Sequence, residues 1–238
     1  MATILAIDTS AKPVSCAVVQ GGRVIGSFYS NTGLTHSQTL MVMLENVLHI
    51  SGLTVDQLDA LAVNAGPGSF TGVRIGVSAV KGLAFTHKKT CISISTLESM
   101  AENVAAPCDA VICGAMDARC QQVYTALFEK SEAGETVRLS EDAAVSIADL
   151  AEQLKKIERP IILVGDGAEV CYNALKESVP NLVIAPPAVR YQNAAATAVV
   201  AHRRLEMGET VSAEELLPVY LRLPQAEREL NSRLAKEQ

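Results

Sequence analysis

Dense apolar runs alternate with longer segments of helical periodicity along the whole chain. Short β-branched and aliphatic runs of this kind are typical of buried strands. They predict strands at residues 3–8, 58–64, 91–95, 110–117 and 161–164. Apolar spacing of three and four predicts helices at residues 37–50, 71–85, 96–104, 147–157, 168–176 and 193–207. Strands that alternate with helices favour largely parallel sheets with helices on their faces.

The order of these elements repeats along the chain. Runs 14–20 and 23–29 flank Gly21-Gly22, which predicts a hairpin because paired glycines suit a primed turn. A second hairpin is expected at 122–129 and 136–140. Each half then reads as a strand ending in Asp, a hairpin, a helix, a strand, a glycine loop and a helix, which indicates internal duplication.

This duplication predicts an α/β fold of the actin-like (ASKHA) class, with two lobes that each hold a mixed sheet and helices. We expect an N-terminal lobe at 1–104 and a C-terminal lobe at 105–192. The segment of about 193–238 is expected to pack back on the first lobe, with a tail from residue 217 onward.

The composition limits the classes of function that the chain can have. The 238 residues are 49% apolar and 19% charged, with a net charge of −6, which indicates a well-packed globular protein that repels a phosphate backbone. Contact with nucleic acid is therefore expected only beside a basic partner. The six cysteines form no CxxC pair and are expected to be reduced core residues. Since the sequence also shows no signal peptide and no membrane span, we expect a cytoplasmic protein.

Residues 66–76 hold four glycines and a proline between a predicted strand and a predicted helix. Glycines there allow a tight turn and close approach, so the run is either a phosphate cradle or a shoulder for helix packing. Asp8, Thr9 and Ser10 end the first strand, where a carboxylate and hydroxyls suit Mg²⁺ and phosphate oxygens. With Gly66 and Gly68 they are the candidate nucleotide contacts. The alternative is that short carboxylates such as Asp8, Asp117 and Asp166 only cap turns.

The two helices on either side of the glycine run are candidates for a partner-binding surface. The first is apolar around most of its circumference from residue 40 to 48, and the second carries small residues one turn apart. The alternative is that both are buried in their own lobe. The predicted interface residues are Leu40, Met43, Leu44, Val47, Gly72, Val73, Gly76 and Val80.

No metal site or catalytic nucleophile is expected. None of the four histidines lies three or four residues from another, and no cysteine has a neighbouring histidine in a recognisable motif.

Residues 66–76 with 81–84 closely resemble the signature of the TsaB (YeaZ) family, bacterial subunits of tRNA threonylcarbamoyladenosine biosynthesis. Segments 4–10, 36–37, 58–62, 95–98 and 218–222 are also similar to it. The family is a metal-free paralogue of the TsaD/Kae1 family. TsaD carries an HxxxH metal-binding motif, whereas the corresponding residues here, 96–100, include no histidine.

The resemblance implies a non-catalytic scaffold that activates synthesis of N6-threonylcarbamoyladenosine at position 37 of tRNA. It implies a heterodimer with TsaD, a homodimer when TsaD is absent, and support of the ATPase TsaE. ATP and threonylcarbamoyl-AMP would be used by the complex, tRNA would be met only through it, and the chain itself would need no cofactor and have no peptidase activity. The alternative function is an actin-fold ATPase or phosphotransferase that uses Asp8 and Asp166.

Overall fold

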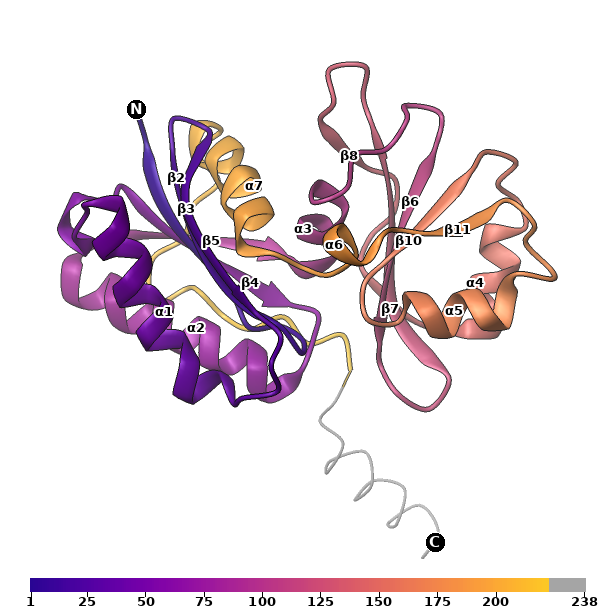
Figure 1. Ribbon diagram of the computed structural model, residues 1–238, viewed down its shortest axis with the longest axis horizontal. Coiled ribbons are helices and arrows are strands. Elements are labelled where there is room, and N and C mark those ends of the chain that lie inside the picture. Colours follow the sequence, from indigo (N-terminus) through magenta and orange to yellow (C-terminus); the bar gives the residue numbers. More distant parts are fainter. Residues whose placement is uncertain (223–238) are drawn as a thin grey trace, which may run out of the picture.

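The computed structural model describes residues 1–222, which form two sheets with helices on their faces (Figure 1). The first sheet has the strand order β3-β2-β1-β4-β5, with antiparallel pairing in the hairpin and parallel pairing from β1 to β5. Its strands are β1 (Thr3–Asp8), β2 (Val14–Gln20), β3 (Arg23–Ser30), β4 (Ala60–Gly66) and β5 (Thr90–Ser95).

Both faces of the first sheet are covered at its centre, which explains why β1 and β4 are buried along their whole length without alternation. Leu5 and Ile7 of β1 pack with α1 (His36–Ser51) and α2 (Phe70–His87). Ile4 and Ala6 face α7 (Ala194–Glu206) on the other side. Figure 1 shows α7 opposite α1 and α2 across the sheet, although α7 follows the second sheet in the chain.

The second sheet repeats the arrangement. Its order is β11-β10-β6-β7-β8, with β9 also paired to β7, so each lobe has a hairpin, a first strand and two parallel strands in the same sequence. Its strands are β6 (Val111–Asp117), β7 (Gln122–Lys130), β8 (Thr136–Arg138), β9 (Ala143–Ser146), β10 (Ile161–Val164) and β11 (Leu182–Ile184). Its helices are α3 (Thr96–Glu102), α4 (Ile147–Leu154), α5 (Ala168–Leu175) and α6 (Pro187–Arg190). The predicted duplication is confirmed.

Four short elements escaped the sequence analysis: β9, β11, α6 and the 3₁₀ turn Val55–Gln57. Each has only three or four residues, too few for a periodic pattern to develop. Pro187 begins α6, a position at which its missing N–H costs no hydrogen bond.

Helices α3 and α7 join the two lobes. Ser99 of α3 lies 2.8 Å from the hydroxyl of Thr197 on α7. Glu98 accepts from Arg204 at 2.5 Å, and Glu102 from Arg203 at 2.7 Å. These contacts fix α3, which packs on the second sheet, to α7, which packs on the first.

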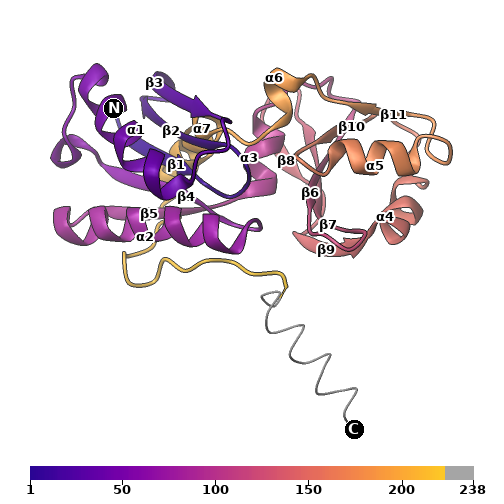
Figure 2. The ribbon, with the colours of Figure 1, turned by 60° about the horizontal axis from the view of Figure 1, so that its bottom comes forward.

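Beyond α7 the chain returns along α2 toward the second lobe (Figure 2). From residue 223 onward the predicted tail lies outside the described residues. Within residues 1–222, no helix is long and apolar enough to cross a membrane.

Candidate functional site

The glycine run joins the end of β4 to the start of α2. Ser69 caps the helix by accepting from the Gly72 amide. A Cβ at Gly68 or Gly72 would lie within 3.0 Å of the carbonyl oxygen of Ser10 or Thr9, a distance that real Cβ atoms essentially never show. At Gly76 a Cβ would lie 2.5 Å from Thr9 Oγ1. The glycines therefore let α2 press directly against the turn that follows β1.

That turn is fully buried and its polar groups bond within the chain. Asp8 Oδ1 accepts from the amide and hydroxyl of Ser10 at 2.8 and 2.7 Å, and Oδ2 accepts from Asn64 Nδ2 at 2.6 Å. Burial raises the pKa of Asp8 above its ordinary value, although these hydrogen bonds oppose the shift. Thr9 Oγ1 donates to the Gly72 carbonyl, and the Ser69 amide donates to the Ser10 carbonyl, both at 2.7 Å.

Nucleotide contact by Asp8, Thr9 and Ser10 stays a prediction, and their burial counts against it. Gly66 is also buried, and Gly68 is half-buried against Ser10. Of the two roles open to the glycine run, its contacts support helix packing.

On the second lobe, two carboxylates bond to nearby backbone. Asp166 Oδ1 accepts from the Asp117 amide at 3.1 Å, and Asp117 Oδ1 accepts from the Arg119 amide at 2.7 Å. Burial raises the pKa of Asp166, and the charge of Asp117 adds to the rise. These contacts agree with the alternative that Asp117 and Asp166 cap turns. In the described part of the chain, no group of three or more His, Cys, Asp or Glu side chains is arranged to hold a metal ion.

The structure corrects the residues of the predicted partner surface. Seven of the eight are buried in the core of their own lobe, because they form the faces of α1 and α2 that pack on the first sheet. Met43 alone of the eight is partly exposed. The buried residues are Leu40, Leu44, Val47, Gly72, Val73, Gly76 and Val80.

Away from the sheet, the same two helices carry exposed apolar side chains that are not among the predicted interface residues. On α1, the exposed fractions of Met41, Val42 and Ile50 are 54%, 57% and 61%. On α2, Phe85 is 73% exposed. We call these four residues together the outer apolar face; on α1, Met41 and Ile50 are nine residues apart and lie on opposite flanks of the helix, with Val42 between them. Helical spacing could not have selected these residues, because α1 is apolar on so many sides that spacing does not tell which side meets the sheet.

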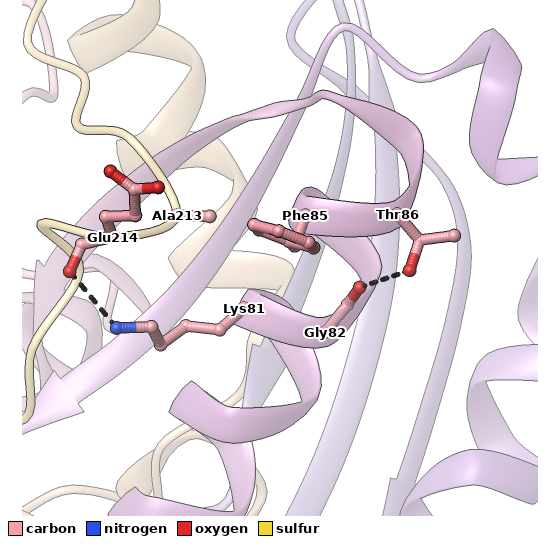
Figure 3. Close-up of a pocket in the computed structure, with 6 residues that line it drawn as sticks. All are labelled: Lys81, Gly82, Phe85, Thr86, Ala213 and Glu214. Carbon is pink, nitrogen blue, oxygen red and sulfur yellow. Dashed lines mark hydrogen bonds between the residues drawn. The ribbon is translucent and has the colours of Figure 1, made fainter.

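A hollow of about 560 Å³ adjoins Phe85. In Figure 3, the Phe85 ring points toward Ala213, and Lys81 Nζ donates to the Glu214 carbonyl at 3.2 Å. The hollow is lined by Lys81, Gly82, Phe85, Thr86, Ala213 and Glu214. The apolar surface of α2 thus continues to the segment that returns from α7.

Known proteins similar to this chain agree with the fold and the signature. The family model described as TsaD, tRNA N6-adenosine threonylcarbamoyltransferase, matches residues 30–230. The tRNA threonylcarbamoyladenosine biosynthesis protein TsaB of Escherichia coli is 32% identical over 92% of this chain and 94% of its own. TsaB of Bacillus subtilis is 30% identical over 94% of this chain and 96% of its own.

Solved structures give the same result. YeaZ from Pseudomonas aeruginosa has a TM-score of 0.75 at 28% identity, with 93% of this chain and 100% of that one covered. Component A of (R)-2-hydroxyglutaryl-CoA dehydratase from Acidaminococcus fermentans has a TM-score of 0.52 at 12% identity, covering 87% of this chain and 100% of that one, and shares the fold alone. The two duplicated lobes form the actin-like (ASKHA) fold. By its sequence and its structure, the chain belongs to the TsaB (YeaZ) family.

Proposed function

We propose that this chain is a non-catalytic accessory subunit in the synthesis of N6-threonylcarbamoyladenosine at position 37 of tRNA. In this proposal it binds the TsaD-type transferase through α1 and α2, supports the ATPase TsaE, and forms a homodimer through the same surface when TsaD is absent. The names of its TsaB relatives support its place in this pathway.

The outer apolar face carries the proposal. Burying a large apolar side chain completely stabilises a complex by about 1.5–3 kcal/mol, and the residues of this face are each more than half exposed. Burying these four together would contribute several kcal/mol, enough to anchor a specific complex once the cost of association is met.

The buried polar groups support an accessory role rather than a catalytic one. Asp8 and the glycine run make contacts inside the chain, and Thr96, Leu97 and Met100 of the segment that corresponds to HxxxH are buried. In this proposal the chain has no peptidase activity and needs no cofactor, while ATP and threonylcarbamoyl-AMP are handled by the complex. Its charge of −6 suits contact with tRNA only beside its partners. The place of action is the cytoplasm.

The proposal is tested by placing a charge on the outer apolar face. Val42→Asp would bury an unpaired carboxylate in the complex, at a cost of several kcal/mol, and should weaken binding to the HxxxH-bearing paralogue of the same cell at least about 100-fold. Val170→Asp is the matched control, because Val170 is an exposed helical valine (46%) on α5 of the second lobe.

Affinity is measured by titration calorimetry, with circular dichroism to verify that both variants remain folded. The same Val42→Asp change should convert any homodimer to monomer in light scattering. Wild-type affinity in a folded Val42→Asp variant would contradict the proposed surface. ATP turnover by the purified chain that is lost in Asp8→Asn would contradict the non-catalytic role.

A further inference from the structure

Residues 211–222, here called the strap, follow the flank of α2 from its C-terminal half to its first turn (Figure 2). The strap begins as an added bridge at the edge of the first sheet. Val211 and Cys91 exchange two backbone hydrogen bonds of 2.9 Å. Lys81 Nζ then donates to the carbonyls of Glu214 and Leu216 at 3.2 and 3.1 Å.

The strap next holds the first turn of α2. The Val219 amide donates to the Ala65 carbonyl at 2.7 Å, at the end of β4. The Tyr220 ring stacks on Phe70 with centroids 4.6 Å apart, and its hydroxyl accepts from Arg74 Nε at 2.9 Å. The Arg74 guanidinium in turn lies 4.0 Å from the centroid of the Phe70 ring. Phe70 and Arg74 of α2 therefore both contact Tyr220 of the strap.

Gly66 takes part in the contact with the strap. A Cβ there would lie within 3.0 Å of the Val219 carbonyl oxygen, so this glycine, the last residue of β4, makes room for the strap backbone. The glycines of the run therefore make room for two different segments. Gly68 and Gly72 accommodate the turn after β1, and Gly66 accommodates the strap.

The strap ends on the other lobe. Arg222 Nη1 donates to the carbonyl of Ala118, the residue that follows β6. Only three residue steps separate Val219, held on the first lobe, from Arg222, and three extended residues span at most about 10 Å. The Arg222 side chain adds its own reach to this segment, so a displacement of α2 relative to the second lobe that exceeds their combined reach breaks either the Ala118 contact or the Ala65 contact.

We propose that the strap couples partner docking on α2 to its own attachment on the second lobe, so that the partner favours one of two states, strap seated or strap released. This inference rests on the proposed function, in which α2 forms part of the docking surface. Linkage is reciprocal: the seating of the strap must change partner affinity by the same factor by which the partner changes seating.

The test removes the far anchor and leaves the outer apolar face unchanged. Arg222→Ala is compared with Arg159→Ala, an exposed arginine of the second lobe, in the full chain. Hydrogen exchange of the 211–222 amides and titration calorimetry with the HxxxH-bearing paralogue are measured on both variants. Coupling predicts faster exchange and a change in Kd of about fivefold or more for Arg222→Ala, with neither for the control.

Other outcomes overturn the inference. Faster exchange with unchanged Kd means that the strap is a passive support. A changed Kd with unchanged exchange means that Arg222 touches the partner directly. If neither changes, Arg222 does not hold the strap. The proposed function is judged separately, because Val42→Asp weakens binding only if the exposed side of α1 is part of the docking surface.

Discussion

Gly72→Ala tests whether the glycine run exists for packing. Gly72 does not adopt a positive φ, so alanine fits its backbone conformation and the effect must be steric. The added methyl group would collide with the backbone carbonyl of Thr9, which has no rotamer by which to move away. Gly82→Ala is the matched control at an exposed position of the same helix, since nothing lies within 4 Å of a Cβ at Gly82.

The magnitudes follow from three effects. Overpacking costs about 1–3 kcal/mol. A shift of α2 also weakens the 2.7 Å bond from Thr9 Oγ1 to the Gly72 carbonyl, worth about 1 kcal/mol. The helix preference of alanine returns up to about 1 kcal/mol at either position. Gly72→Ala should therefore lower the free energy of unfolding by about 1–3 kcal/mol, whereas Gly82→Ala should raise it by up to about 1 kcal/mol.

Urea unfolding followed by circular dichroism measures both variants against the wild type. Equal stability of Gly72→Ala and Gly82→Ala would refute the packing role, because it would mean that α2 does not press against Thr9. We expect neither variant to gain affinity for nucleotides, because Asp8 and its neighbours stay buried.

Three further predictions address other contacts. Because burial raises the pKa of Asp8, the folded state retains a proton that the unfolded chain has released, so stability falls as pH rises above the ordinary value of 3.8 through the raised pKa. In Asp8→Asn this pH dependence of stability should disappear, which urea midpoints measured across pH would show. A pH profile equal to that of the wild type would contradict the prediction. Glu98→Ala removes the acceptor of two arginines between the lobes and should lower the free energy of unfolding by about 2 kcal/mol, against less than about 0.5 kcal/mol for the exposed Glu152→Ala; equal losses would refute this. Of the six thiols only Cys108 and Cys120 are exposed, so a thiol reagent at neutral pH should titrate two quickly and the other four only after denaturation; rapid titration of more than two would show that the core is open.

The element pattern was largely readable because the sheets are buried on both faces. Strands such as β1 and β4 have no solvent-facing positions, so they stand out as dense apolar runs, and Gly66 marks the end of β4. The duplication was readable for the same reason, since β6 and β10 repeat the pattern.

The contacts that individual residues make were much harder to predict than the elements. A phosphate cradle and a packing shoulder both require small residues, and only the position of the Thr9 carbonyl opposite Gly72 favours packing. In α1, Leu44 and Val42 have similar apolar character, but one faces the sheet and the other faces solvent. That choice depends on how the helix is rotated against the sheet, which periodicity does not fix in a helix that is apolar on most sides.

The individual contacts of the strap had no sequence signal, although residues 218–222 resemble the family signature and the segment of about 193–238 was expected to pack back on the first lobe. Its contacts use backbone amides and carbonyls together with Lys81 and Arg74, which lie over 130 residues away in the chain. Such contacts exist only once both lobes have folded, so no local pattern predicts them.

The central claim is that this chain supports tRNA modification by docking, not by catalysis. It is tested most directly by reconstituting threonylcarbamoyladenosine formation with the cell's HxxxH-bearing paralogue, its ATPase partner and tRNA, and by measuring the modified nucleoside by mass spectrometry. The account predicts modification with wild-type chain and with Val170→Asp, and its loss with Val42→Asp. Full modification without this chain, or with a folded Val42→Asp variant that no longer binds the paralogue, would contradict the account.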